Sequence, residues 1–304
     1  MNDTPFTIED TVFVDCPTSY EGKVVIPDGI TDIGDKALLF CNKVTDIELP
    51  ETLEGIGLCA FHGCGFTHIK IPKRCQYIAD AAFLCCQSLK EIDLPDGLLV
   101  IGEATFCGCS ALERVHIPDS VRIIRAEAFA GCAKLESITL PENLERLDAM
   151  AFDECKSLKE IVIPDGCRFL CYGVFQKCTS LERAIIGNSV TNDEGGECCF
   201  LNCTSLKYVK LSGSMVCVIA GFFEGCTNLE NVEIPEGVRL IDCEAFKGCT
   251  SLESITLPRS MVEIYEYAFE GCSNLRHIKM PVHTVINSHA FIGCPEVITI
   301  ERYL

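Results

Sequence analysis

The stretch LKEIDLPDGLLVIGEATFCGCSA, residues 89–111, decides the fold because close copies of it follow along the chain. LERVHIPDSVRIIRAEAFAGCAK occupies 112–134, LESITLPENLERLDAMAFDECKS occupies 135–157, and LESITLPRSMVEIYEYAFEGCSN occupies 252–274. The period is 23 residues. A unit this short cannot bury its own apolar side chains, whereas stacked copies share one core, so the repeat predicts a solenoid.

Two residue types keep the register of the repeat along the whole chain. One cysteine recurs at Cys41, Cys64, Cys86, Cys109, Cys132, Cys155, Cys178, Cys203, Cys226, Cys249, Cys272 and Cys294. Three residues earlier the chain carries Leu38 in the first copy and then Phe61, Phe83, Phe106, Phe129, Phe152, Phe175, Phe200, Phe223, Phe246, Phe269 and Phe291. These register positions predict about twelve coils with a column of aromatic and thiol side chains inside.

Each copy contains signals for two extended segments and one compact segment. Residues 89–95 alternate in their second half, as in a strand with one buried face, so that Leu89, Ile92 and Leu94 face inward, and the proline then ends the strand. A second apolar pair follows, and the Ala-rich and acid-rich segment after it favours a helical turn. We therefore expect an α/β repeat solenoid, a right-handed arc of about twelve 23-residue coils with short strands and short helical or 3-10 turns. We expect residues 1–23 to form an N-terminal β-rich cap and 24–304 the solenoid.

The pattern Leu-x-x-Ile-x-Ile-Pro-x-x-Val-x-x-Ile-Gly-x-x-Ala-Phe-x-x-Cys resembles the BspA-like leucine-rich repeats, also called the Treponema type. LPDGLLVIGEATFCGC and IPEGVRLIDCEAFKGC are close matches, and the resemblance covers about residues 24–300. It implies a leucine-rich-repeat fold and a protein, bacterial or protist, that binds other proteins at the cell surface. It implies no catalytic residues.

The charge and composition exclude several classes of function. Acidic residues outnumber basic ones 44 to 25, which gives a formal net charge of −19. Phosphate binding needs a basic surface, so nucleic acid is excluded as a partner. No apolar run approaches a membrane span, and the N-terminal residues do not read as a signal peptide. We expect a cytoplasmic protein without membrane insertion, with the cell surface as the alternative that the resemblance implies.

The chain has 23 cysteines, and their arrangement favours structural thiols. The register cysteines are expected to act as small buried groups that bond a carbonyl of the neighbouring coil. Two groups outside the register are candidate metal ligands, namely Cys59, His62 and His68, and Cys167, Cys171, Cys198 and Cys199. We nevertheless expect no cofactor or metal and no enzymatic activity. A thiol-rich metal- or redox-responsive protein is the alternative function.

The stretch AIIGNSVTNDEGGECCFLNC, residues 184–203, departs from the repeat. It contains a two-residue insertion at TNDEGGE, which lengthens the gap between Cys178 and Cys203 to 25 residues. The insertion predicts one irregular coil with a bulged acidic corner. A binding loop is the alternative, because insertions in repeat proteins map to one face and often carry function.

The outward strand positions predict where a partner binds. Most are charged or small, but Val162, Ile185 and Tyr208 on three consecutive coils are apolar. Such a cluster on a polar sheet favours a contact site, although strand propensity alone also explains β-branched residues there. The predicted site consists of Glu160, Val162, Arg183, Ile185, Tyr208 and Lys210. The predicted function is a non-catalytic scaffold that binds a protein through the exposed sheet face.

Overall fold

The structure is a computed structural model that describes residues 5–191 and 195–304. The chain divides into two compact units, Met1–Asn143 and Leu144–Leu304, here called the N-terminal and C-terminal units. Each unit is described by itself below. The described residues contain no helix long and apolar enough to cross a membrane.

Every coil contributes short strands. Those of the N-terminal unit are β1 (Thr7–Glu9), β2 (Val12–Asp15), β3 (Gly22–Val25), β4 (Asp32–Ile33), β5 (Val44–Glu48), β6 (Gly55–Ile56), β7 (His68–Lys70), β8 (Tyr77–Ile78), β9 (Glu91–Asp93), β10 (Val100–Ile101), β11 (Arg114–His116) and β12 (Ile123–Ile124). Those of the C-terminal unit are β13 (Arg146–Leu147), β14 (Glu160–Ile163), β15 (Phe169–Leu170), β16 (Arg183–Ile186), β17 (Tyr208–Lys210), β18 (Cys217–Val218), β19 (Asn231–Glu233), β20 (Leu240–Ile241), β21 (Ser254–Thr256), β22 (Glu263–Ile264), β23 (His277–Pro281), β24 (Val285–Ile286) and β25 (Thr299–Tyr303).

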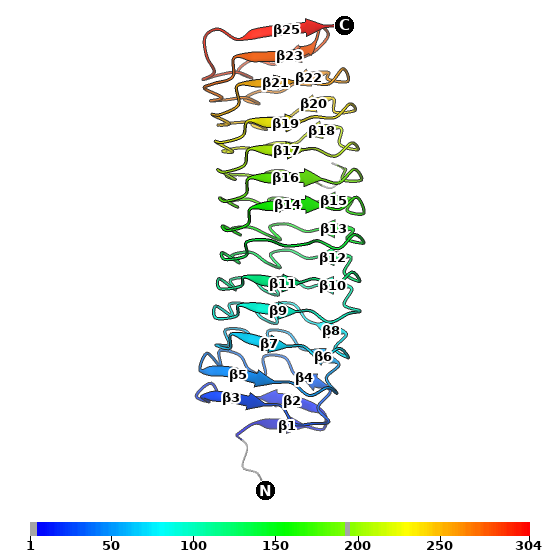
Figure 1. Ribbon diagram of the computed structural model, residues 1–304, viewed down its shortest axis with the longest axis vertical. Coiled ribbons are helices and arrows are strands. Elements are labelled where there is room, and N and C mark those ends of the chain that lie inside the picture. Colours follow the sequence, from blue (N-terminus) through cyan, green and yellow to red (C-terminus); the bar gives the residue numbers. More distant parts are fainter. Residues whose placement is uncertain (1–4, 192–194) are drawn as a thin grey trace. The chain divides into compact units, whose positions relative to one another are not determined.

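In the N-terminal unit the strands form two ladders, whose members follow one another from coil to coil (Figure 1). The first ladder contains the sheets β3–β5 and β7–β9–β11, and the second contains β1–β2–β4–β6–β8 and the pair β10–β12. Pairing is parallel and shifts by one repeat, so that Glu91 on β9 stands beside His68 on β7 and Arg114 on β11. The exception is β1, which pairs antiparallel with β2.

The C-terminal unit repeats this plan. Its first ladder contains the sheets β14–β16–β17–β19 and β21–β23–β25, and its second contains β13–β15 and β18–β20–β22–β24. In both units the outward side chains of the first ladder form a surface that we call the sheet face. The alternation predicted from the sequence is confirmed on β14, where Ile161 and Ile163 are buried and Glu160 and Val162 are exposed.

The predicted helical or 3-10 turns are wrong, because the described residues contain no helix. The compact segment of each coil instead places two residues with positive φ four positions apart, as in Ala104 (φ 50°) and Gly108 (φ 72°). Right-handed helix needs negative φ at consecutive residues, so it cannot continue through these positions. The N–H of Phe106 donates to the Ala128 carbonyl at 2.8 Å, and that of Gly108 to the Ala130 carbonyl at 2.7 Å. The third side is therefore also bonded from coil to coil.

The core is a stack of identical side chains, as the register predicted. The rings of Phe83 and Phe106 stack with their centroids 5.3 Å apart, and those of Phe246 and Phe269 do so at 5.0 Å. Apart from Phe291, which is half-buried, the register phenylalanines are fully buried. The ring spacing is close to the separation of neighbouring strands, so one aromatic column can follow the ladders without strain.

The register thiols line a corner of this core and bond to the preceding coil. Cys109 Sγ lies 3.2 Å from the Phe83 carbonyl, which also accepts the N–H of Cys86 at 3.1 Å. The same thiol-to-carbonyl contact recurs at Cys64, Cys86, Cys132, Cys178, Cys203, Cys226, Cys249, Cys272 and Cys294. The bond to a carbonyl predicted from the sequence is confirmed. All 23 cysteines are free thiols, and burial raises the pKa of Cys86 to about 12.

The fold comprises about 13 coils of about 23 residues, slightly more than the register cysteines predict. The difference arises at the N-terminus, where β2 pairs in parallel with β4 and the Cys16 N–H donates to the Ala37 carbonyl. These contacts add a partial coil before the first register cysteine. The predicted division into a cap at 1–23 and a solenoid at 24–304 stays a prediction, and β3 crosses its boundary.

Candidate functional site

The predicted site residues lie on the sheet face of the C-terminal unit. Strand pairing places Glu160, Arg183 and Tyr208 in one row across β14, β16 and β17. The same pairing places Val162, Ile185 and Lys210 in the neighbouring row. All six side chains therefore occupy adjacent outward positions on three consecutive coils.

The first row is held in place by interactions between coils. Arg183 Nη1 donates to Glu160 Oε1 at 2.6 Å, and the Arg183 guanidinium lies over the Tyr208 ring, 5.3 Å from its centroid. The Tyr208 hydroxyl donates to Glu233 Oε1 at 2.6 Å. This hydrogen bond raises the pKa of Tyr208, and burial adds to the effect. The row thus contains one ion pair next to an aromatic ring, and the hydroxyl of that ring reaches Glu233 in the neighbouring row.

The second row supplies the apolar part of the site. Val162 is 50% exposed, Ile185 is half-buried between its neighbours, and Lys210 is exposed. Tyr208 in the adjacent row is also half-buried. The apolar surface is smaller than the sequence alone suggests, because cross-strand neighbours cover part of Ile185 and Tyr208. What remains is a compact apolar spot with a polar border.

The insertion lies next to this site in the chain. Gly187 takes the place of the repeat's proline, and a Cβ there would stand 2.4 Å from the Pro164 carbonyl oxygen, so only glycine fits. The Asn188 N–H donates to Asp165 Oδ1 at 2.6 Å, which ties this corner to the preceding coil. The proposed binding loop at 191–197 falls in part outside the described residues, which omit 192–194.

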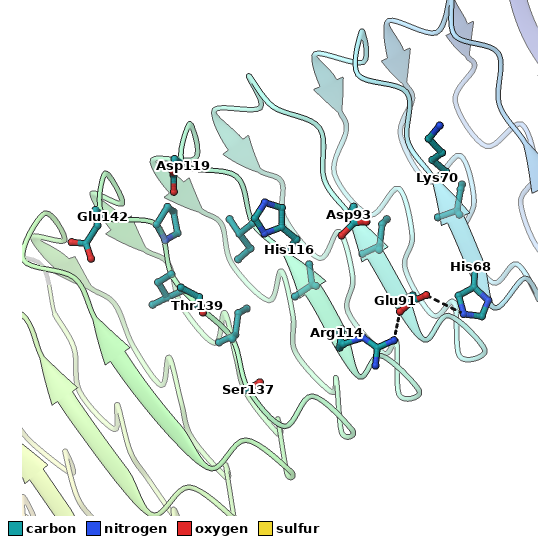
Figure 2. Close-up of a pocket in the computed structure, with 17 residues that line it drawn as sticks. His68, Lys70, Glu91, Asp93, Arg114, His116, Asp119, Ser137, Thr139 and Glu142 are labelled. Atoms are coloured by element: carbon teal, nitrogen blue, oxygen red, sulfur yellow. Dashed lines mark hydrogen bonds and ion pairs between the residues drawn. The ribbon is translucent and has the colours of Figure 1, made fainter.

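A second candidate region on a sheet face lies in the N-terminal unit. A hollow of about 700 Å³ extends over β7, β9, β11 and the segment 137–142 (Figure 2). Glu91 stands between two basic groups, with Oε1 3.4 Å from His68 Nε2 and Oε2 paired with the Arg114 guanidinium. Figure 2 shows Asp119 and Glu142 at the far side of the hollow, away from this paired row.

The hollow exists because the sheet stops at β11. Residues 137–139 form no strand, and β11 is the last member of its sheet. The inward residues beside the break, Val115 and Ile138, are half-buried, whereas Ile69 and Ile92 at the same repeat position are buried. The sequence does not predict this break in the sheet, because residues 135–141 match the repeat as well as the neighbouring copies do.

The structure separates the first group of candidate metal ligands. His62 packs on Phe40 with ring centroids 4.8 Å apart, and burial lowers its pKa. His68 instead lies on β7 and faces Glu91. Within the described part of the chain no group of three or more His, Cys, Asp or Glu side chains could hold a metal ion.

The second group of candidate ligands is divided between the core and the surface. Cys167 and Cys199 are buried, and Cys167 Sγ lies 3.5 Å from the Phe169 carbonyl. Cys171 and Cys198 are half-exposed, and Cys171 Sγ lies 3.7 Å from Asp148 Oδ1. The first contact lies within one coil and the second joins neighbouring coils, and nothing observed in the described residues favours a thiol-based function.

Comparison with known proteins identifies the repeat. A family model described as BspA type leucine rich repeat region (6 copies) matches residues 6–133, 78–207 and 193–302. The crystal structure of a leucine-rich repeat protein from Bacteroides ovatus is 36% identical, with a TM-score of 0.84 over 90% of this chain and 71% of that chain. None of the curated proteins compared with the chain matches it.

Two more distant structures share the fold. A leucine rich cell surface protein from Faecalibacterium prausnitzii is 21% identical, with a TM-score of 0.53 over 98% of this chain and 93% of that chain. The pneumococcal vaccine antigen PcpA is 19% identical, with a TM-score of 0.57 over 95% of this chain and 85% of that chain.

Proposed function

The chain belongs to the BspA type leucine-rich repeat family, and from this membership we propose that it is a non-catalytic scaffold that binds a partner protein through its sheet face. Leucine-rich-repeat proteins generally act as protein-interaction scaffolds. The binding site proposed for this chain comprises Glu160, Val162, Arg183, Ile185, Tyr208 and Lys210.

One observation carries the choice of this site. The exposed Val162 side chain lies beside a row in which Arg183 is fixed between Glu160 and the Tyr208 ring. Side chains that are already ordered lose little conformational entropy when a partner binds, and tyrosine and arginine are enriched among residues that dominate binding energy. An apolar centre with a pre-ordered polar border is the arrangement expected of a protein contact.

The partner is expected to be neutral or basic on its contacting surface. The chain has a formal net charge of −19, so an acidic protein would be repelled at long range. This charge also argues against nucleic acid. A cytoplasmic location stays our prediction. The cell surface is the alternative, supported by the family and by the printed description of the Faecalibacterium protein.

The test compares the unaltered protein with a triple variant, Val162→Ser, Ile185→Thr and Tyr208→Ser. Both are used as bait in extracts of the source organism, bound proteins are quantified by mass spectrometry, and the affinity of the enriched partner is then measured. We expect the triple variant to bind this partner at least ~30-fold more weakly, because loss of one buried tyrosine contact typically costs about 2 kcal/mol.

The matched control changes His277→Ser and Lys279→Ser, two exposed sheet-face residues on β23 of the same unit. It should retain full affinity. Thermal unfolding is used to check that both variants are folded, which we expect because the altered positions point outward. Unchanged affinity in the folded triple variant would show that Val162, Ile185 and Tyr208 are ordinary strand surface.

A further inference from the structure

The second ladder of the N-terminal unit carries a hollow of about 870 Å³. Three large apolar side chains stand around it with much of their surface in water: Leu58 is 41% exposed, Tyr77 is 54% exposed and Leu99 is 56% exposed. Exposed apolar residues gathered around one concavity mark a binding site more often than scattered ones do. This hollow lies on a different ladder from the sheet face.

One residue in the lining of the hollow, Gly102, has to be glycine because of a neighbouring carboxylate. Asp80 Oδ1 accepts the N–H of Glu103 at 2.8 Å. A Cβ on Gly102 would lie 2.5 Å from that same oxygen, so no larger residue fits there while the hydrogen bond is kept. Gly102 and Ala79 therefore contribute little side-chain bulk to a lining that also contains Leu58, Tyr77 and Leu99.

The position of Tyr77 also depends on a neighbouring glycine. A Cβ on Gly55 would lie 3.2 Å from Tyr77 Cδ1, so the ring lies against the β6 backbone at this point. The residues on β6 and β8 are paired directly across the ladder. The ring is thereby supported on one side, and its exposed surface is available to a ligand.

The rim contains more acidic than basic groups. The carboxylates are those of Asp35, Asp80 and Asp96, and the cations are Lys73 and Arg125. Together they give the rim a formal charge of −1, in a chain whose net charge is −19. A ligand that complements this rim is cationic next to its apolar part, because long-range attraction and local pairing then act in the same direction.

We propose that this hollow binds a basic segment of a partner protein, with one large apolar side chain seated between Tyr77 and Leu99 and an adjacent Lys or Arg facing Asp80 and Asp96. The site is independent of the sheet-face site, because its residues belong to the second ladder of the other unit.

The test uses the absence of tryptophan from this chain, which makes a tryptophan in an added peptide the only indole fluorophore. The probe is the capped peptide Gly-Arg-Gly-Trp-Leu-Gly-Arg-Gly, titrated with the full chain. We expect a saturable blue shift of the peptide fluorescence as the indole leaves water. The peptide in which both arginines are glutamates should bind at least ~10-fold more weakly, which corresponds to about 1.4 kcal/mol.

The variant Tyr77→Ser with Leu99→Ser should reduce the affinity for the basic peptide at least ~10-fold. The matched control is Val216→Ser, because Val216 is 52% exposed and directly precedes β18, as Leu99 directly precedes β10. Val216→Ser and the triple sheet-face variant should both bind as the unaltered chain does. Absence of saturable binding, equal binding of the acidic peptide, or full affinity in the folded Tyr77 and Leu99 double variant would each overturn the proposal.

Discussion

Burial of individual thiol and carboxyl groups determines their hydrogen bonding and their pKa in this chain. The register cysteines combine a small volume with a weak donor, which suits a corner where one carbonyl already accepts a backbone N–H. Their burial and their contacts were predictable from the sequence, because a buried S–H group needs a hydrogen-bond acceptor and a carbonyl of the neighbouring coil has a second lone pair available. The side chain of Asp153 was not singled out from the sequence, because its repeat position is held by residues as different as His62, Ala130 and Lys247 and so does not reveal how buried it is.

Asp153 is an acidic group without adequate solvation. Its Oδ1 atom is buried and accepts no hydrogen bond within the described residues, and Lys177 Nζ lies 3.9 Å away. Burial raises the pKa of Asp153, and the opposing charge of Lys177, with hydrogen bonds from the Gln176 side chain and the Glu154 N–H, offsets this only in part. The native state therefore binds the proton more tightly than the unfolded state, and protonation of Asp153 stabilises the fold.

Asp153→Asn should raise the free energy of unfolding at pH 8 by about 1 kcal/mol, because it removes a charge that is buried without a full set of partners. The gain should shrink as the pH falls towards 4, since the unaltered protein then gains stability by protonating Asp153. Urea denaturation of both proteins across this range measures the difference. Asp93→Asn on the exposed sheet face is the control and should change stability by less than about 0.5 kcal/mol. A gain that does not depend on pH would contradict this account.

At the scale of elements, the strands were predictable and the third side of each coil was not. Alternation of apolar and polar residues reports directly which face of a strand is buried, and the proline marks its end. The compact segment has an Ala-rich and acidic composition that is equally suited to a helical turn. Its φ values are set by hydrogen bonds to the next coil, and residues such as Ala104 and Glu127 adopt positive φ without any signal in their chemistry.

The cost of placing a side chain at a positive-φ position can be tested by substituting one of the glycines found there. Gly248 has φ of 72°, and a Cβ there would meet nothing closer than 3.7 Å, so Gly248→Ala adds backbone strain without a clash. We expect it to lower the free energy of unfolding by about 1 kcal/mol, the usual cost of the left-handed conformation. Gly213 is the control, because its φ is not positive and its nearest neighbour would lie at 3.5 Å. Gly213→Ala should leave stability unchanged or slightly higher, and equal losses at both sites would refute the explanation.

At the scale of the whole molecule, repetition made the fold predictable and left the sites only partly so. The outward rows around Val162 followed from the register, but the cover that Ile185 and Tyr208 receive from neighbouring strands depends on packing. The hollow over β7, β9 and β11 depends on a break in the sheet at residues 137–139, and the amino acids at these positions do not predict that break. The hollow beside Tyr77 depends on Gly102 and Asp80, which lie on different coils.

Because each coil contacts mainly its neighbours, a core substitution in one coil should destabilise that coil and its neighbours more than distant coils. Phe200 is buried between Phe175 and Phe223, with ring centroids 5.6 Å and 5.9 Å away. Phe200→Ala should cost about 3–5 kcal/mol. Hydrogen exchange should show the greatest loss of amide protection at 170–191 and 195–230, with smaller changes at 252–290 of the same unit. Uniform loss across the C-terminal unit would show instead that it unfolds as one cooperative block.

The bonding of the third side from coil to coil also has a mechanical consequence. Backbone hydrogen bonds on all three sides of a coil point towards the next coil, so a pulling force between the first and last coils of one unit acts along the bonds themselves. Bonds loaded in this direction open in sequence, whereas bonds sheared sideways must break together. Each coil that detaches frees about 23 residues, or roughly 80 Å of extended chain. A unit of this kind would yield gradually under tension and lengthen in small steps, behaving as an extensible tether for whatever is attached to its ends.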